Sequence, residues 1–540
     1  MAAAPTRLVH RIPVRLRHQW KPAALLCVGL AVLLVFFGDA RISPWVTSAS
    51  AEDSDTITEN ILGTVDLYDE STSHSIQLEY DQDDFDEMID SYVEDGSKEY
   101  IEADLTIDGT FVNSVGIRLK GNSTLRSLAS GSGQQGGANR QQGGGNGGGA
   151  AGGMGGGGGA GMGGAGGGGM AGGGGGGMMN IQLSREKPEE LPWLIKIDEY
   201  VEGRAYQGER QIAVRPGSNA GLPLNEAVSL ALVDESDQAA QRYSFSTLKT
   251  NNRPAATRLI VENPSKEYAE NTVGTDGVLY KSLSTGSFTY QGDDPTEYET
   301  DFKQLTKEGS QDLQPVIDLI KWTEDATDKE FAEELDEYVD VKSFARYVAT
   351  QNLLLNFDDM SGPGKNYYLW YDLDTKKFSV LGWDYNLTFS GDATAGPDDA
   401  MGMGGAGGMR GGAAQGGDTA EPGGTQGAPE GMPSGMPSGM PQGGAQDGAR
   451  QGGGGMAGGH QLKERFLELD AFDDVYHEAY QDLYEQFFGS GSALDALDGI
   501  VADAKKAGAP TAGLDTAAKT LRSTITSRTQ SLAKDEVITG

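Results

Sequence analysis

The chain has few of the residues that most enzymes use for nucleophilic or metal chemistry. It holds one cysteine, Cys27, and five histidines in 540 residues. Cys27 lies within an apolar run near the N-terminus, so the rest of the chain has neither a disulfide nor a thiol nucleophile. Beyond that run only His74, His460 and His477 remain, and none has a second histidine at metal-ligand spacing, which disfavours a histidine-based zinc site. A G-x-S-x-G motif is also missing, which disfavours serine-hydrolase chemistry.

Basic residues are scarce relative to acidic ones. The chain carries 42 lysines and arginines against 79 aspartates and glutamates, a formal net charge of −37. A field of this sign repels nucleic acid and anionic lipid, so we expect no nucleic-acid partner. The simplest interpretation of the acidic excess is that it keeps the protein soluble.

Glycine is abundant in only two segments. Of the 81 glycines, 30 lie within 131–180 and 24 within 401–460, which leaves the rest of the chain near the average of globular proteins. Segments built of glycine, methionine, alanine and proline bury too little apolar surface to offset chain entropy. We therefore predict two disordered inserts, at 131–179 and at 391–460.

The N-terminus has the pattern of a targeting segment. Five basic residues between Arg7 and Lys21 precede an apolar run from Ala23 to Phe37. A run of this length is short for a spanning helix and suits a signal peptide, although a signal anchor with its basic end in the cytoplasm is an alternative. We expect residues 1–50 to direct export. The folded part would then be secreted, or anchored at the cell surface by this one segment if the leader stays uncleaved.

The first part of the folded chain has mainly strand patterns. Residues His74–Tyr80 alternate as a strand, and apolar side chains within 85–92 recur with helical spacing. Asp108-Gly109 and Asn251-Asn252 are turn pairs between alternating segments, which predicts two hairpins.

From about Gln311 the pattern becomes helical, through 313–325, 328–338 and 341–356. Strands first and helices second indicate an α+β protein with two lobes. We predict a sheet-rich lobe from 57–130 and 180–345, a catalytic or metal-binding segment at 346–390, and a C-terminal helical region at 461–540.

Carboxylates and a carboxamide are concentrated in one stretch, 354–386. Asp358 and Asp359 follow a predicted helix, Asn366 begins a strand, and Asp384 ends the strand that returns. Such groups at the neck of a hairpin can meet around one Mg²⁺, which prefers a few oxygen ligands plus substrate phosphates. Protein kinases combine the same parts: an Asp that accepts the hydroxyl proton, an Asn, and a metal-holding Asp. The spacing leaves a second interpretation open, in which the aspartates only cap a helix and begin a turn.

Four parts of the chain, taken together, resemble the CotH family of atypical protein kinases, which are secreted or belong to spore coats. They follow one another in the family's order over roughly 74–390, and the glycine-rich inserts are not part of the pattern. The similar segments are VGIRLKGNST (Val115–Thr124), LIKIDEYVEG (Leu194–Gly203), TRLIVEN (Thr257–Asn263) with GVLYKS (Gly277–Ser282), and NFDDMSGPGKNYYLW (Asn356–Trp370) with GWDYN (Gly382–Asn386).

The resemblance implies a diverged, two-lobed kinase fold in which ATP, with Mg²⁺ or Mn²⁺, phosphorylates a protein hydroxyl. It implies that Asp384 holds the metal with help from Asn366, and that Asp358 is the catalytic base. Asp359 is the rival for that role because the doubled aspartate leaves the register open. Asp358 follows Asn356 in the family's N-x-D spacing, so we assign it the hydroxyl-facing role and expect Asp359 to accept backbone N–H groups of its loop.

The resemblance also implies a set of nucleotide-binding residues. Phe378 stands where the family has an aromatic ring, more usually Trp, that stacks on adenine; a plain core ring is the alternative. Lys196 and Glu226 resemble the strand lysine and helix glutamate that steer phosphates in kinases; two unrelated surface charges are the alternative. The turn that could bring backbone N–H groups near phosphates consists of Lys120, Gly121, Asn122 and Ser123, and an ordinary hairpin is the alternative.

Two other functions remain open on the same fold. The protein could be a non-catalytic surface or spore-coat-like binding protein, or it could carry out another nucleotide transfer such as AMPylation or glutamylation. The intact set of Asp358, Asn366 and Asp384 argues against a non-catalytic role.

Overall fold

Seven strands in the first part of the chain close into a barrel. The computed structural model describes residues 56–121, 124–131, 183–217, 221–399 and 459–540. Residues 57–306 and 313–540 form one compact unit, and 307–312 fall outside it. The predicted leader, the first predicted insert and most of the second lie outside the described residues, as do Asn122 and Ser123.

The barrel runs in the order β2-β3-β4-β5-β7-β9-β8 and closes through a parallel pairing of β8 with β2. All its other neighbouring strands are antiparallel. A short parallel pair, β1 (Glu59–Ile61) with β6 (Arg204–Tyr206), lies outside it. The barrel strands are β2 (His74–Tyr80), β3 (Ile101–Ile107), β4 (Thr110–Leu119), β5 (Trp193–Lys196), β7 (Gln211–Val214), β8 (Tyr243–Thr250) and β9 (Ala256–Glu262).

Both predicted hairpins are confirmed. Asp108 and Gly109 have positive φ angles of 49° and 81°, as a tight turn between β3 and β4 requires. Asn251, with φ 45°, begins the turn between β8 and β9. The predicted helix after His74–Tyr80 is α4 (Gln82–Asp95), which buries its four large apolar side chains between Phe85 and Tyr92.

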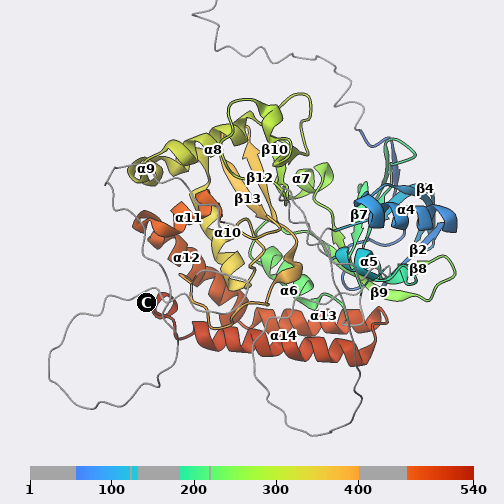
Figure 1. Ribbon diagram of the computed structural model, residues 1–540. Helices are drawn as coiled ribbons and strands as arrows, with labels where there is room; N and C mark the ends of the chain where they lie inside the picture. The colour runs from blue at the N-terminus through green and yellow to red at the C-terminus, as the bar shows by residue number, and fades with distance from the viewer. Residues whose placement is uncertain (1–55, 122–123, 132–182, 218–220, 400–458) are drawn as a thin grey trace, which may run out of the picture. The chain divides into compact units, whose positions relative to one another are not determined.

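A second sheet has the order β11-β10-β12-β13 and is antiparallel throughout. Figure 1 shows α13 and α14 side by side below α6, and α10 beside β13. The strands are β10 (Gly277–Ser282), β11 (Phe302–Gln304), β12 (Tyr367–Asp372) and β13 (Phe378–Gly382). The remaining helices are α5 (Arg126–Gly131), α6 (Leu224–Glu235), α7 (Lys266–Thr272), α8 (Gln314–Asp325), α9 (Asp328–Tyr338), α10 (Val341–Leu353), α11 (Gln461–Glu468), α12 (Asp473–Tyr484), α13 (Ser492–Lys506), α14 (Thr511–Leu532) and α15 (Glu536–Thr539), with short turns of helix at Pro188–Glu190, Pro295–Tyr298, Tyr385–Leu387, Asp470–Phe472 and Glu485–Gly489.

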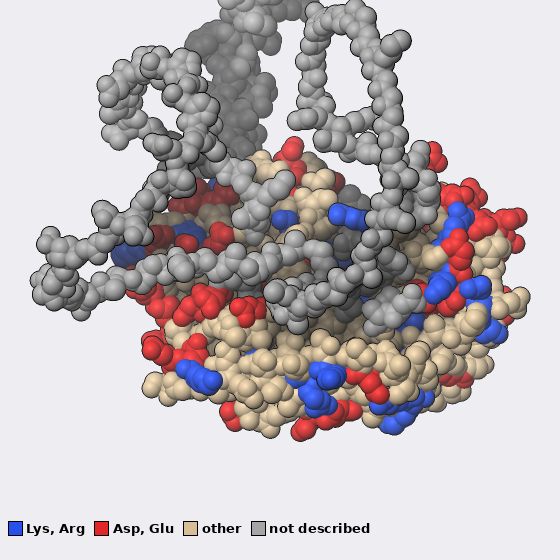
Figure 2. All heavy atoms as spheres, turned by 60° about the horizontal axis from the view of Figure 1, so that its bottom comes forward, with Lys and Arg blue, Asp and Glu red and all other residues tan. Residues whose placement is uncertain are grey.

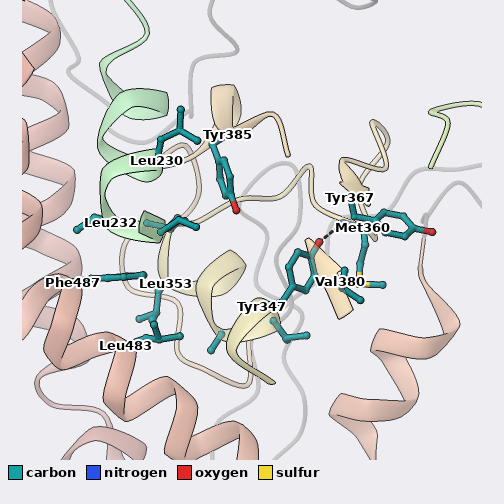
Figure 3. Packing of buried hydrophobic residues seen from close by; sticks show 14 of the residues in the cluster. Leu230, Leu232, Tyr347, Leu353, Met360, Tyr367, Val380, Tyr385, Leu483 and Phe487 are labelled. Carbon is teal, nitrogen blue, oxygen red and sulfur yellow. Dashed lines mark hydrogen bonds between the residues drawn. The ribbon is translucent and has the colours of Figure 1, made fainter. Parts of the chain in front are cut away.

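Three apolar clusters hold these layers. One fills the barrel and the inner face of α4. The largest joins one face of the second sheet to α6, α8, α10 and the C-terminal helices, and Figure 3 shows Leu230, Leu353, Tyr385 and Phe487 within it. A small third cluster, which includes Tyr368 and Trp383, covers the other face of the sheet.

The mixed helix and strand content agrees with the predicted α+β class, whereas the closed barrel was not predicted.

Residues 391–399, which were predicted to belong to the second insert, make specific contacts with the folded part. Asn352 donates to the carbonyl of Gly396, and Tyr476 donates to that of Pro397. On the face shown in Figure 2, acidic and basic side chains are intermixed. Within the described residues, no helix is both long and apolar enough to cross a membrane.

Candidate active site

The loop after α10 holds Asp358 and Asp359 in a fixed conformation. The hydroxyl oxygen of Tyr347 accepts a hydrogen bond from the Met360 N–H at 3.2 Å (Figure 3). Asn356 accepts from the Asp358 N–H at 3.2 Å. Asp359 accepts from the Ser361 N–H at 2.8 Å, as expected for the turn-fixing aspartate, and its other oxygen pairs with Lys463 of α11.

Asp358 is bonded through both carboxylate oxygens and is 8% exposed. One oxygen accepts from the Gly364 N–H at 2.5 Å and the other from the Asn366 side chain at 3.0 Å. A Cβ on Gly364 would lie 2.5 Å from an Asp358 oxygen, so only glycine permits this approach. Burial, reinforced by the nearby charge of Asp384, raises the pKa of Asp358 to about 6. A carboxylate with such a pKa suits a general base near neutral pH.

Asp384 follows β13 in a left-handed conformation, with φ 58°. Its Oδ1 atom lies 3.1 Å from a guanidinium nitrogen of Arg215, which directly follows β7. This ion pair does not have hydrogen-bond geometry, so the oxygen is buried without a hydrogen bond, and the Oδ1 atom of Asn386 is buried without one as well. The barrel and the β12–β13 hairpin therefore meet at Asp384.

Three basic side chains surround the ring of Trp383. The distances from its centre are 5.2 Å to the Lys120 ammonium, 5.2 Å to the Arg215 guanidinium and 5.7 Å to the Lys281 ammonium. Burial, together with the neighbouring cations Lys281 and Arg215, holds the pKa of Lys120 well below its usual value. Lys120 donates to Asn263 at 2.7 Å, which orients it. We call Lys120, Arg215 and Lys281 the cation cluster.

The predicted pair of Lys196 with Glu226 does not form. Lys196 pairs instead with Glu199 at 2.8 Å, three residues along its own segment. Glu226 on α6 is 1% exposed and pairs with Arg215. The helix glutamate is thus paired, but its partner is Arg215, which directly follows β7, and not the predicted lysine. The reason is the short β5, which ends at Lys196 and leaves this side chain partly exposed.

The structure places Phe378 in the core, the alternative that the sequence left open. Its ring is 2% exposed and packs on Tyr371 at 4.8 Å between ring centres. Strand alternation puts Phe378 and Trp383 on opposite faces of β13, so Phe378 does not reach the cation cluster.

In the turn predicted to lie near phosphates, the Gly121 carbonyl accepts a hydrogen bond from the Lys98 ammonium group at 2.5 Å.

The available oxygens fit a magnesium ion only if a substrate completes its shell. Among the residues that the structure describes, no group of three or more His, Cys, Asp or Glu side chains could hold a metal ion. Asp384 and Asn386 nevertheless each have a buried side-chain oxygen that makes no hydrogen bond, although that of Asp384 is ion-paired with Arg215. Mg²⁺ is often bound through one or two carboxylates plus substrate phosphates, so this sparse set is compatible with it.

Sequence reasoning named Lys120 and Asp384 but missed most of their neighbours. Asn263, Lys281 and Trp383 lie in the segments that carry the family resemblance, at or next to strand ends, and the fold brings these ends together. Their common position at strand ends could have identified these three residues from the sequence. Arg215 lies outside those segments, so no such pattern indicated it.

Comparisons with known proteins indicate which family this chain resembles. A family model described as CotH kinase protein matches residues 176–507, which include Arg215, Asp358 and Asp384 but not Lys120. The chain is 24% identical over 200 residues to the inner spore coat protein H of Bacillus subtilis (strain 168). That match covers 36% of this chain and 54% of the relative, so the chain spans about half of the relative's length.

Proposed function

The chain belongs to the CotH family, and from this premise we propose that it transfers the γ-phosphoryl group of ATP to a hydroxyl group of a protein. The observation that carries the proposal is the cation cluster next to Asp384. The cluster holds three basic groups, and the carboxylates near them are Asp384 and Glu226. A surplus of buried positive charge is costly unless an anion compensates it, and a polyphosphate is such an anion.

In this proposal the barrel and the helical part act as the two lobes of a kinase-like fold. Lys120, Arg215 and Lys281 bind phosphate oxygens at the junction, and Asp358 accepts the proton of the attacking hydroxyl. Asn366 holds the Asp358 carboxylate in place through its hydrogen bond of 3.0 Å. Mg²⁺, bound at Asp384 with Asn386 or Asn366 as a further oxygen ligand, would neutralise charge on the transferred group.

We place the protein outside the cytoplasm or at the cell surface. The N-terminal pattern of a signal peptide or signal anchor supports export, and the similar Bacillus protein is named for the spore coat. The protein substrate would then be an exported or coat-associated protein.

The test uses the full chain with Mg²⁺ and ATP labelled at the γ- or the α-phosphate. Transfer of γ-label alone to protein supports phosphorylation, whereas α-label indicates adenylyl transfer. Asp384→Asn should abolish γ-transfer and remove the thermal stabilisation by Mg·ATP, because a ligand stabilises only the state that binds it. Asp372→Asn is the matched control, since Asp372 lies at the other end of the same hairpin and only fixes its turn. Unchanged stabilisation in Asp384→Asn would overturn the metal assignment.

A second function, binding without catalysis, is favoured by one observation. Both oxygens of Asp358 are already bonded within the loop, which is what a purely structural aspartate would show. Retained Mg·ATP binding with no transfer of either label to any acceptor would support this second function.

A further inference from the structure

A cavity of about 420 Å³ lies beside the barrel, in a region that the proposed phosphoryl transfer does not use. Its lining comes from the chain that follows β1, between Leu62 and Tyr68, from Gln207 and Glu209 after β6, and from Arg242 just before β8. None of the cation-cluster residues lines it.

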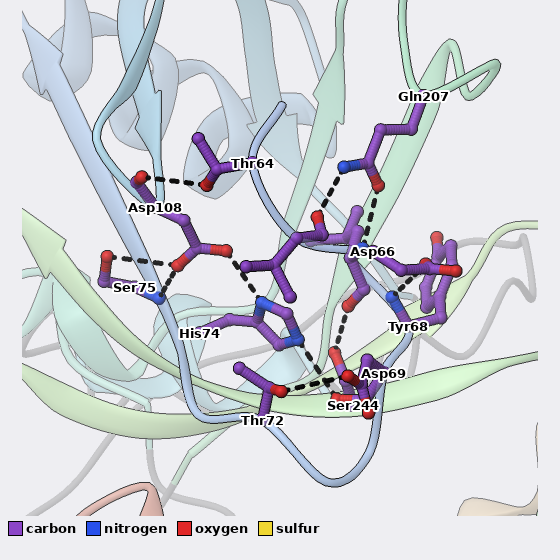
Figure 4. A network of polar contacts seen from close by, with 12 residues as sticks. Thr64, Asp66, Tyr68, Asp69, Thr72, His74, Ser75, Asp108, Gln207 and Ser244 are labelled. Atoms are coloured by element: carbon purple, nitrogen blue, oxygen red, sulfur yellow. Dashed lines mark hydrogen bonds and ion pairs between the residues drawn. The ribbon is translucent and has the colours of Figure 1, made fainter. Parts of the chain in front are cut away.

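The walls of this cavity are held in place by the hydrogen bonds drawn in Figure 4. The side chain of Gln207 accepts from the Leu67 N–H at 2.8 Å and donates to the carbonyls of Leu62 and Val65. Ser244 of β8 donates to the Leu67 carbonyl at 2.6 Å. The segment that forms one wall is therefore tied to strand β8 and to the turn that follows β6, so the cavity does not need a ligand to form.

Two residues that line the cavity each have one buried polar atom that makes no hydrogen bond. Glu209 is 2% exposed and its Oε2 atom makes no hydrogen bond. Tyr68 is 8% exposed and its hydroxyl group makes none either. A buried polar atom without a hydrogen bond is destabilising, so a ligand that pairs with these two atoms removes that cost.

The charge around these groups is negative. Arg242 is the single base among the lining residues, and it contacts both Glu209 at 2.5 Å and Glu262 at 2.6 Å. Asp66 adds a further carboxylate to the lining. Burial, reinforced by the Glu262 carboxylate, raises the pKa of Glu209 to about 7, so this carboxylate is mostly ionised only above that pH.

We propose that this cavity, which we call the Glu209 pocket, binds an organic cation with N–H donors, an alkylammonium or alkylguanidinium group. Its N–H groups would donate to Glu209 Oε2 and to the Tyr68 hydroxyl oxygen. Leu62, which is 75% exposed, and Val65 would cover the methylene chain behind the cationic head. Free polyamines and the lysine or arginine side chains of a polypeptide share this chemistry.

Other ligand classes fit less well. The carboxylates outnumber the single arginine, so the local field repels an anion. A metal ion would need several carboxylate or histidine ligands, and the described residues contain no such group of three or more. A neutral apolar ligand would leave Glu209 Oε2 unpaired.

The test is titration calorimetry on the full chain without nucleotide, at pH 8 and low salt. The probes are spermidine and the peptide acetyl-Gly-Lys-Gly-amide, and choline serves as a matched cation that has no N–H donor. We expect saturable binding of spermidine, the peptide or both, and at least about tenfold weaker binding of choline, because its cationic nitrogen has no N–H to donate to Glu209. Spermidine alone would indicate a free polyamine as the source, and the peptide alone would indicate a polypeptide.

Two variants locate the binding in the pocket. Glu209→Gln removes one charge and should weaken binding about tenfold or more, and Tyr68→Phe should weaken it several-fold. Glu189→Gln is the matched control, because Glu189 is also a buried barrel-side glutamate paired with a half-exposed arginine, Arg253. Equal binding by Glu209→Gln and the wild type, choline binding as tight as spermidine, or no saturable binding of either N–H probe would overturn the proposal. Asp384→Asn should bind both probes normally, so failure here is separable from failure of the phosphoryl-transfer proposal.

Discussion

Asp358 and Asp359 are neighbours in the chain, but their carboxylates have different surroundings. Asp359 pairs with Lys463 and fixes the turn, while Asp358 lies near Asp384. Asp358→Ala should therefore reduce kcat by about 10² to 10⁴ with little change in Mg·ATP binding. Asp359→Ala should lower the melting temperature first, because it leaves Lys463 buried without its partner. Single-turnover kinetics and thermal melts of both variants check this, and an essential Asp359 with a dispensable Asp358 would reverse the assignment.

The raised pKa of Asp358 predicts a pH dependence with a definite sign. The base must be ionised, so kcat should fall as pH drops from 7 to 5, through the folded-state pKa of about 6. The raised pKa also means that this group contributes stability below its unfolded value of 3.8 and loses that contribution as pH rises through about 6. The loss of activity in acid is thus not a loss of Asp358-linked stability. A kcat that stays flat from pH 7 to 5, in a protein whose melting temperature is also followed, would contradict a base role.

In the nucleotide-free protein, Lys120 should lower the stability of the fold. It is buried beside other cations, and its pKa is held well below the usual value by that burial. Lys120→Met should raise the melting temperature by a few degrees, since it removes a buried charge and keeps the volume, and should weaken Mg·ATP binding at least about tenfold. Lys187→Met, at a half-exposed lysine outside the cluster, is the control. A drop in stability with unchanged nucleotide affinity would remove Lys120 from the phosphate site.

At the scale of elements, the two faces of β13 have separate roles. Phe378 and Val380 face the large core, while Leu381 and Trp383 belong to the cluster on the other face. Phe378→Leu should therefore reduce stability by about 1–3 kcal/mol without changing KM for ATP. Trp383→Leu should raise that KM, because it removes the ring that the cation cluster surrounds. Steady-state kinetics and denaturant titrations of the two variants separate these effects, and a raised KM in Phe378→Leu would restore its stacking role.

Local elements were predictable from the sequence because local patterns determine them. The turn at Asp108-Gly109 and the helix that contains Phe85 depend on residues a few positions apart. Barrel closure depends on the pairing of β2 with β8, more than 160 residues away, and no short pattern encodes it. The same holds for Arg528 of α14, which is fully buried and donates to the carbonyls of Asn352 and Leu353 at the end of α10.

Those residues of the candidate site that lie together in one segment of the sequence could be predicted. Asp358, Asn366 and Asp384 all lie within one short stretch. The structure joins Asn366 to Asp358 by a hydrogen bond, whereas its predicted role beside Asp384 at a metal stays a prediction. The predicted partner of Glu226 was wrong. From the sequence alone, a lysine and an arginine near strand ends are equally plausible partners, because the positions at which the strands end are not known. Arg215 occupies that position because β7, not β5, ends beside α6.

At the scale of the whole molecule, the positive charge of the cation cluster contrasts with the formal net charge of −37 of the chain. A protein of this charge repels free ATP over long range, so the site needs local compensation at the point of binding. Screening lengths are about 8 Å at physiological salt, which makes the buried cluster more important than the distant surface. If the proposed function holds, we expect the site to prefer a metal-complexed nucleotide, whose charge is reduced, over the free polyanion.

The first glycine-rich segment should be removable without loss of the fold. Its flanks meet in the described structure, because Leu183 donates its N–H to the Ser127 hydroxyl at 3.1 Å, and Leu128 and Leu183 are buried in the same cluster. Replacing 132–182 by a linker of about six residues changes the loop-closure cost by only about 2 kcal/mol, in the stabilising direction. We expect a melting temperature within about 5 °C of the wild type and unchanged phosphoryl transfer, measured by calorimetry and γ-label transfer. In the shortened chain, Leu183→Ala should still lower the melting temperature, since it leaves a cavity where the two flanks meet. A fall of more than about 10 °C from the replacement alone would show that the segment contributes to the folded structure.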